Sequence, residues 1–305
     1  MGDLGLLHLY SHLLFWVVLG WGLGRVLPAL CVQRLGKFLF WIGVPLSVLG
    51  FLWQADLSGE AWLAPAVAWL AMGLGVGGAW IWLTHTATPW QSPTQGSFLL
   101  AAMVGNTGYI GYPVALLILG PRYFSWSLFY DMLGTLLGSY GVGVYVAARF
   151  GRPAEGIWQP LQHVVVNPTL WAFALGLALH GHERPSGVDW ALGGWAWIAV
   201  GLSLVLMGMR LSHLQPKGSW RPAWVSLGIK MVGVPLLTGI ALTWIGLATQ
   251  PRLALVLQSA MPPALSTLVL AEAYHLDQDL TVLTQVLGMG LLLATLPLWI
   301  TLFGA

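Results

Sequence analysis

Apolar residues fill ten long segments of this 305-residue chain, and polar residues gather in the short stretches between them. Most of these segments have about the 20 residues that an α-helix needs to cross the hydrocarbon core of a bilayer. The pattern therefore predicts an all-α membrane protein with about ten spans. The expected spans are residues 7–24, 35–53, 61–83, 97–119, 124–148, 161–180, 191–209, 222–246, 252–273 and 280–303.

Composition supports a membrane protein and excludes a soluble one. Hydrophobic residues make up 57% of the chain and charged residues only 7%, whereas a soluble domain has about 25% charged residues. No Asp, Glu, Lys or Arg lies between Glu60 and Arg122. Two spans with a short loop explain that stretch. The net charge of +2 is scattered between spans, so it does not indicate nucleic-acid binding.

The fourth segment, residues 97–120, is interrupted in its middle by residues that weaken a helix. These residues are Gly105, Asn106, Thr107, Gly108, Gly111 and Pro113. A second interruption, Met261-Pro262-Pro263, falls in the ninth segment. Backbone groups freed inside a membrane must be satisfied, so broken helices usually line a cavity or a binding site.

The two interrupted segments are each the fourth span of a five-span half. An odd number of spans makes the second half insert upside down, which is the inverted-repeat plan of many transporters. The sequence therefore predicts one five-helix repeat in residues 1–150 and a second, inverted repeat in residues 151–305. Paired interruptions at corresponding positions indicate a transporter's binding site.

Basic residues in the loops predict the orientation, because cytoplasmic loops are rich in Lys and Arg. The loops expected inside the cell carry Arg25, Arg34, Lys37, Arg149, Arg152, Arg210, Lys217 and Arg221. The opposite loops carry Arg122, Arg184 and Arg252. We therefore expect a multi-pass protein of the cytoplasmic (inner) cell membrane with both termini outside the cytoplasm.

Two motifs carry a resemblance to a known family. They are GNTGYIGYP at residues 105–113 and MPPALSTLVLAEAYHLD at residues 261–277, together with the Asn167-Pro168 opening of the sixth span. In these motifs and in its hydropathy pattern, the chain resembles the auxin efflux carrier family, which includes plant PIN-type carriers and bacterial organic-anion permeases.

The resemblance implies a fold of ten helices in two inverted repeats. Spans 4 and 9 would be broken at prolines and cross near the bilayer centre, with Asn106 facing an anionic substrate. It also implies a scaffold of spans 1, 2, 6 and 7, an elevator-like transport domain of spans 3–5 and 8–10, and a possible homodimer. Many relatives carry a second asparagine in span 9, where this chain has Ser266 and Thr267.

Crossed half-helices offer a physical basis for anion binding. The N-terminal end of a helix has roughly half a positive charge and free N–H groups, so two such ends can hold a carboxylate without a buried arginine. Asn106 can orient the anion or bind a cation, or else cap the unwound backbone. The candidate substrate-binding residues are Gly105, Asn106, Thr107, Gly108, Pro113, Gln258, Pro262, Pro263, Ser266 and Thr267. The two hydroxyls have a structural alternative, which is bonding back to helix carbonyls.

Ionisable residues inside expected spans are the second clue, because such residues are costly in lipid. Asp131 in the fifth span and Lys230 in the eighth span are candidates for proton or ion coupling, or the two residues pair with each other. The alternative for Lys230 is that its long side chain reaches the cytoplasmic interface. Glu272 is expected to be solvated.

Three functions are compatible with the sequence. The first is a secondary or facilitative carrier of a small organic anion, auxin-like or a dicarboxylate, working by alternating access. The second is a sodium-coupled carrier of the bile-acid type. The third, a non-transporting sensor or an intramembrane enzyme, would need converging catalytic groups. The chain has no H-E-x-x-H, Walker A or G-x-S-x-G motif, so no cofactor or metal is expected, and the expected partners are the anion and the lipid bilayer.

Overall fold

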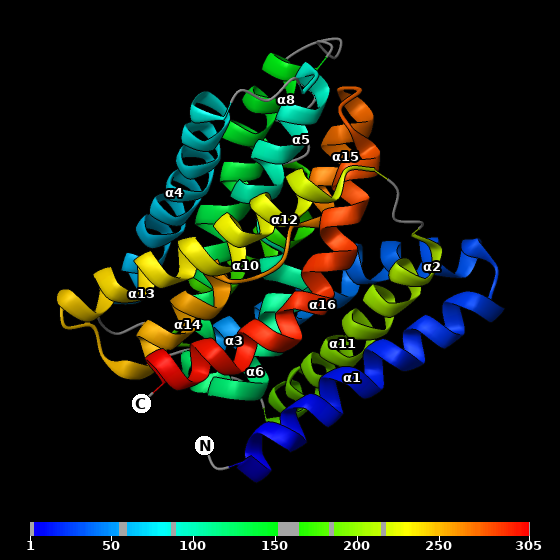
Figure 1. The fold of residues 1–305 in the computed structure, drawn as a ribbon. Coiled ribbons are helices and arrows are strands. Elements are labelled where there is room, and N and C mark those ends of the chain that lie inside the picture. Colours follow the sequence, from blue (N-terminus) through cyan, green and yellow to red (C-terminus); the bar gives the residue numbers. More distant parts are fainter. Residues whose placement is uncertain are drawn as a thin grey trace.

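The computed structural model describes residues 3–54, 60–86, 90–151, 165–182, 186–214 and 218–304. Within these residues every regular element is a helix, apart from one isolated β-bridge between Gly105 and Pro263. The predicted all-α fold is therefore confirmed. Figure 1 shows the helices gathered in one body, with the two ends of the chain at its lower edge and α5, α8 and α15 at its upper end.

The first half of the chain consists of helices that several turns of other geometry interrupt. The α-helices are α1 (Asp3–Val26), α2 (Ala29–Phe38), α3 (Val44–Gln54), α4 (Leu63–His85), α5 (Ser92–Met103), α6 (Tyr112–Leu119), α7 (Phe124–Phe129) and α8 (Val144–Phe150). The π-helical turns are η1 (Leu39–Gly43), η3 (Thr107–Gly111), η5 (Tyr130–Leu136) and η6 (Ser139–Gly143). The 3₁₀ turns are η2 (Glu60–Trp62) and η4 (Pro121–Tyr123).

The second half has fewer interruptions. Its elements are α10 (Pro168–Leu179), α11 (Ser186–His213), α12 (Trp220–Gly228), the π turn η7 (Ile229–Gly233), α13 (Val234–Trp244), α14 (Thr249–Ser259), α15 (Leu265–Ala273) and α16 (Gln278–Phe303). Each expected span overlaps these helices. Residues 161–164 of the sixth span lie outside the described residues.

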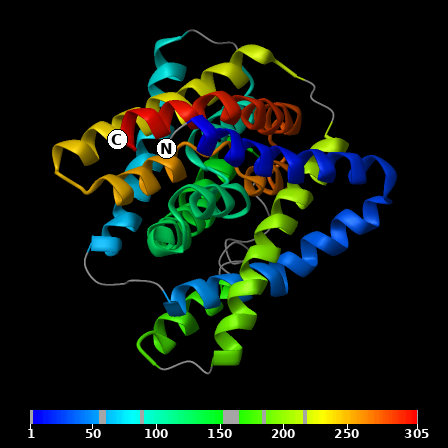
Figure 2. The same ribbon diagram turned by 90° about the horizontal axis from the view of Figure 1, so that it is seen from below.

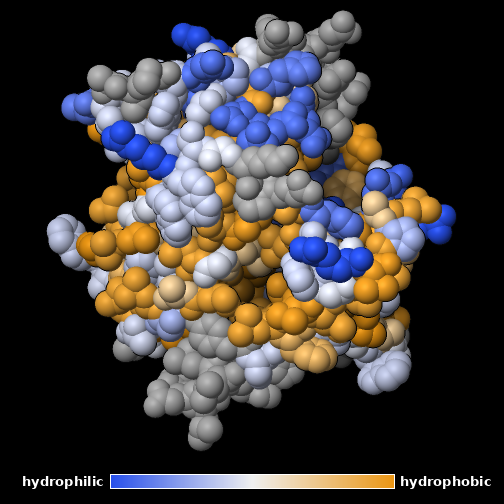
Figure 3. Space-filling model, turned by 45° about the vertical axis from the view of Figure 1, so that its right-hand side comes forward, coloured by the Kyte–Doolittle hydropathy of each residue, from blue (hydrophilic) through white to orange (hydrophobic). Residues whose placement is uncertain are grey.

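Five stretches of the described residues are long and apolar enough to cross a membrane. They are Ala29–Trp53, Leu63–His85, Trp190–His213, Trp220–Trp244 and Gln278–Phe303. Shorter apolar helices are Leu13–Val26, Thr107–Leu119 and Pro168–Leu179. Figure 3 shows the matching surface, a broad hydrophobic band with hydrophilic residues concentrated towards the upper end.

Three of the π turns share a sequence signal, a glycine followed by one residue and a proline. The triplets are Gly43-Val44-Pro45, Gly111-Tyr112-Pro113 and Gly233-Val234-Pro235. A proline lacks the N–H group and clashes with the carbonyl four residues before it, so the preceding turn widens. Because π turns often occur at functional sites, these three turns are candidate positions for such a site.

The helices form two groups that pack mainly within themselves. In one group α1 packs along α11, and α3 packs against both α10 and α11. Figure 2 shows this group along the right and lower sides of the view from below. Glycines permit the close approach, because a methyl group at Gly20 of α1 would overlap Val205 of α11. The other group contains α4–α8 and α12–α16, where α4 contacts α5 and α13 contacts α14.

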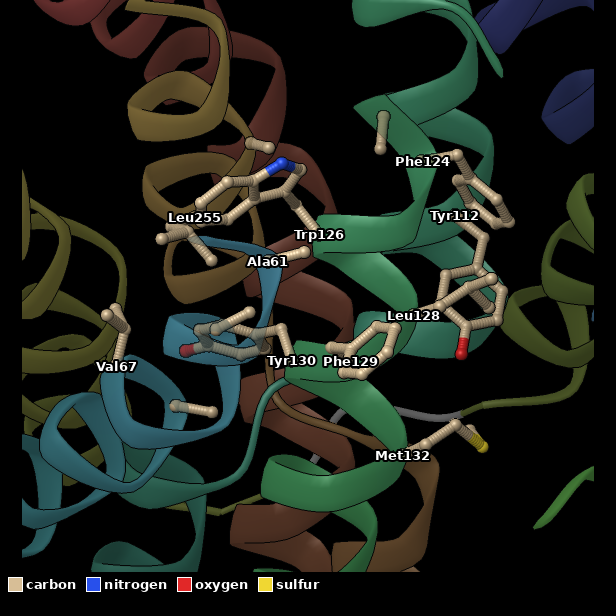
Figure 4. Close-up of a cluster of buried hydrophobic side chains, with 14 of the residues drawn as sticks. Ala61, Val67, Tyr112, Phe124, Trp126, Leu128, Phe129, Tyr130, Met132 and Leu255 are labelled. Carbon is tan, nitrogen blue, oxygen red and sulfur yellow. The ribbon is translucent and has the colours of Figure 1, made fainter. Parts of the chain in front are cut away.

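A cluster of buried aromatic side chains fixes the hairpin of α6 and α7 (Figure 4). The rings of Tyr112 and Phe124 meet edge to face with their centroids 5.1 Å apart, and Phe51 of α3 lies 4.7 Å from Phe124. Edge-to-face pairs are a favourable arrangement of aromatic rings. The cluster therefore holds η3 and η5, which carry polar groups, in a fixed relation to each other.

Candidate functional site

Two helical segments stop and restart at the centre of the second group. Helix α5 ends at Met103 and the chain becomes helical again at Thr107, while α14 ends at Ser259 and α15 begins at Leu265. The two linkers pair through their backbones. Asn106 donates its N–H to the carbonyl of Pro262 over 2.8 Å, and Ala264 donates to Val104 over 3.0 Å. Backbone groups released by the interruptions are thus partly satisfied by each other.

The fourth span was expected to be broken at its proline, and this expectation is wrong. The non-helical residues are 104–106, whereas Pro113 is the second residue of α6. Pro113 lies inside the helix that restarts at Thr107, where the π turn η3 before it accommodates its missing N–H group. Gly105 and Asn106 therefore mark this break, and Pro262 and Pro263 mark the other.

Asn106 caps the helix that restarts after the first break. Its Oδ1 accepts a hydrogen bond from the N–H of Tyr109 over 3.2 Å. The side chain is only 5% exposed. Its Nδ2 group has no hydrogen-bond partner among the described residues, and the residue lines a cavity. The structure thus supports the capping role and leaves one donor group of the same amide for a ligand.

The cavity has a volume of about 180 Å³ and lies where the two restarting helices begin. Helix η3–α6 contributes Thr107 and Gly108, and α15 contributes Leu265 and Ser266. The first N–H groups of a helix have no intrahelical partner and carry partial positive charge. Both helix starts therefore face the same cavity.

Asp131 of η5 lies in the cavity wall and contacts the first helix start. Thr107 Oγ1 donates a hydrogen bond to its Oδ1 over 2.5 Å. A methyl group at Gly108 would lie 3.3 Å from its Oδ2. The hydroxyl of Tyr112 also faces this carboxyl group but does not meet hydrogen-bond geometry. The expected pair with Lys230 is not found, since no ion pair between these two residues appears in the described part of the chain.

Most of the remaining residues of the cavity wall were not predicted as site residues from the sequence. The wall also contains Phe40, Val44, Tyr109, Tyr112, Met132, Thr135, Leu136, Ser139, Tyr140, Asn167, Thr169 and Ala264. Asn167 was noted only as the opening of the sixth span. Its Oδ1 caps α10 by accepting from the N–H of Thr169 over 2.9 Å. Phe40 lies in η1 and Tyr109 lies in η3, and each of these π turns ends at the glycine of a Gly-x-Pro triplet. These triplets were the sequence signal that could have pointed to both residues.

Several predicted site residues lie away from this cavity. Gln258 is fully buried against Gly111, and neither atom of its carboxamide has a hydrogen-bond partner among the described residues. Thr267 donates to the carbonyl of Ala264 over 2.7 Å, which is the back-bonding alternative. Pro113 lines a small hollow on the α3 side of η3. Glu272 is exposed.

A second hollow, of about 10 Å³, lies on another side of Asn106. Pro262 and Pro263 line it together with Gln285 and Arg210. Arg210 was counted as a loop residue, but it lies in the last turn of α11, and its guanidinium stacks on the ring of Tyr109 at 5.7 Å. A positive charge therefore lies beside the restarted helix and outside the main cavity.

Lys230 corrects a further expectation. Its side chain does not reach the interface, because it is 2% exposed. Its Nζ donates to the carbonyl of Ser259 over 3.1 Å, and a methyl group at Gly105 would lie 3.1 Å from both its Cε and its Nζ. The lysine side chain is therefore directed towards the two breaks. The carbonyl of Ser259 gives its ammonium group a hydrogen-bond partner inside the protein.

Comparisons with known proteins identify membrane transporters as the proteins to which this chain is similar. The profile of a family described as "Membrane transport protein" matches residues 159–300. An uncharacterized transporter of Methanothermobacter thermautotrophicus is 29% identical over 289 residues, which are 91% of this chain and 93% of the relative. An uncharacterized transporter of Methanocaldococcus jannaschii is 26% identical over 211 residues, 67% of each chain. These matches, together with the long apolar helices, support a multi-pass membrane transporter of the auxin efflux carrier type.

Proposed function

We propose that this protein is a secondary or facilitative transporter of a small organic anion, and that the anion binds in the cavity at the two helix starts. The observation that carries the proposal is the convergence of Thr107, Gly108, Leu265 and Ser266 on one cavity beside Asn106. Helix N-termini attract carboxylates through free N–H groups and the helix dipole. The free Nδ2 of Asn106 adds a donor that can fix the orientation of the carboxylate.

The size of the cavity limits the substrate. A cavity of roughly 150 Å³ accommodates a benzene molecule, and this one has a volume of about 180 Å³. Aromatic walls from Phe40 and Tyr140 favour a substrate with a flat or apolar body. Both an auxin-like aromatic acid and a short dicarboxylate fit these limits, so they are the two classes to compare first.

Asp131 is the proposed coupling residue. It lies in the same cavity and accepts a hydrogen bond from the helix start that contacts the anion. An ionisable group inside a membrane protein often serves a proton or ion pathway. A carrier driven by membrane potential alone would not need its charge, whereas a proton-coupled carrier would.

The transport cycle remains part of the proposal. We infer that the group containing both breaks moves as a transport domain against the scaffold of α1, α3, α10 and α11, with the breaks crossing near the bilayer centre. Two inverted repeats, residues 1–150 and 151–305, would make the inward- and outward-facing states similar. We also propose a homodimer in the cytoplasmic membrane, with both termini outside the cytoplasm.

A sodium-coupled organic-anion carrier is the second candidate. Oxygen atoms of Asp131 and Thr107 meet at the cavity, and hard cations prefer oxygen ligands. Dependence of anion transport on sodium separates this candidate from the first.

The test is transport in proteoliposomes with imposed pH, sodium and voltage gradients. Indole-3-acetate, malate and malonate are the first labelled anions, and Asn106→Ala is the site variant. Gln250→Ala on the exposed start of α14 is the control. We expect one of these anions to be transported by the wild type and the control, and transport to fall at least about tenfold in the Asn106 variant. Unchanged transport in that variant would remove the site assignment.

A further inference from the structure

The buried ammonium group of Lys230 lies at the C-terminal end of α14 and beside Gly105 in the linker that follows α5. Helices α5 and α14 stop at Met103 and Ser259, and the lysine reaches the carbonyl of Ser259 and the backbone of Gly105. These are C-terminal ends, whereas the cavity is formed by N-terminal starts. The lysine comes from the π turn η7 of another helix, α12–α13.

The C-terminal end of a helix has carbonyl groups without intrahelical partners and roughly half a negative charge. Two such ends that approach each other inside a protein repel unless a cation lies between them. In carriers with broken helices, C-terminal half-helix ends and unwound carbonyls commonly hold the coupling cation. Here a covalently attached ammonium occupies that kind of position, and Nζ of Lys230 donates to one of the carbonyls.

The neighbouring glycine supports a specific fit. Gly105 is in contact range of the lysine on one face and lines the cavity on the other. Any side chain at this position would press on Cε and Nζ. The positive charge is therefore held directly behind the wall of the anion cavity.

We propose that Lys230 is the resident cation of the transport site, which neutralises the two helix ends and favours an anion on the far side of Gly105. The expected effect of Lys230 on transport rests on the proposed function. Its expected effect on the stability of the protein rests on the structure alone. No sodium ion is needed at these helix ends when the lysine is present. Removing the side chain leaves a space bordered by carbonyl oxygens that a small cation can fill.

The first test measures thermal unfolding of the purified full-length protein without substrate. Lys230→Ala is compared with Lys37→Ala, which removes an exposed lysine of α2. We expect methylammonium or sodium, at constant ionic strength against choline, to raise the unfolding midpoint of the Lys230 variant by about 2 °C or more. The wild type and the Lys37 variant should show no such rise. A folded Lys230 variant whose unfolding midpoint responds to small cations no more than that of the wild type would overturn the proposal.

If the alanine variant does not fold, two further variants at the same position decide the question. Lys230→Met, an unbranched apolar replacement, then tests whether the charge matters. We expect its unfolding midpoint to lie below that of Lys230→Arg, because arginine retains a cation. Equal midpoints would contradict the inference.

The second test measures anion transport in proteoliposomes. We expect wild-type uptake to change less than about twofold when choline replaces sodium, and uptake by the Lys230→Ala variant to fall at least about tenfold and recover with methylammonium. A wild type that transports none of the probe anions would contradict the proposed function and leave the unfolding result as the test of Lys230. Uptake by the variant equal to that of the wild type in choline would contradict the role of Lys230.

Discussion

Replacing Thr107 by valine removes one hydroxyl group and nearly preserves the volume of the side chain. In the structure that hydroxyl donates to Asp131 Oδ1 over 2.5 Å, and both residues are buried. The substitution therefore isolates the contact between the first helix start and the acidic group of the cavity.

The size of the effect follows from the type of hydrogen bond. Hydrogen bonds to charged groups contribute about 1.5–3 kcal/mol. Asp131 is 8% exposed at a cavity, so water can replace part of the lost bond, and we expect the lower end, about 1.5 kcal/mol. That is about a tenfold change in an equilibrium constant and a fall of roughly 2–3 °C in the unfolding midpoint of a chain of this length.

A double-mutant cycle measures this contact directly. The wild type, Thr107→Val, Asp131→Ala and the double variant are compared by thermal unfolding in detergent. Thr135→Val is the matched control, because Thr135 lines the same cavity without a hydrogen bond to Asp131. We expect a coupling energy of about 1–2 kcal/mol for the Thr107 pair and near zero for the control. Effects of the two single substitutions that add within about 0.5 kcal/mol would refute the assigned contact.

Three further outcomes follow from buried contacts of the same region. Gly111→Ala should destabilise the protein by about 1–3 kcal/mol in thermal unfolding, because the added methyl group overlaps the Gln258 side chain; an unchanged midpoint would contradict this packing. Gln258→Leu should leave the midpoint equal or higher, since its carboxamide atoms have no partner among the described residues, and a clear loss would show a hidden partner. Tyr112→Phe should change the free energy of unfolding by less than about 0.5 kcal/mol yet weaken anion affinity measured by isothermal titration, because Tyr112 lines the cavity and its buried hydroxyl has no hydrogen-bond partner among the described residues; unchanged affinity would exclude it from the site.

Helices and their apolar character were predictable from the sequence because hydrophobic patterning is local. The expected spans overlap the observed helices, and the interruption near Asn106 is where glycines weaken the helix. The position of the break relative to Pro113 was wrong. Pro113 lies inside a helix that continues through a π turn, and the sequence alone does not show where that helix starts.

Contacts between distant residues were not predictable. The structural alternative for Lys230 was a position near water, because long basic side chains usually reach the interface. Its burial depends on Ser259 and Gly105, which no local pattern places beside it. The cavity wall formed by Phe40 and Tyr140 likewise depends on packing between helices, although π turns at Gly-x-Pro triplets were a usable signal for the first.

Protection of an introduced cysteine against chemical labelling tests most directly whether the anion binds at the two helix starts. In a Cys31→Ser background, Ser266→Cys places a thiol in the cavity wall, and Glu272→Cys places one on the exposed end of the same helix. Labelling by a small methanethiosulfonate reagent is followed with and without the anion that the wild type transports. The account predicts that the anion slows labelling at position 266 at least about threefold and leaves position 272 unchanged. Equal labelling rates at position 266 with and without a transported anion would contradict a binding site at the two helix starts.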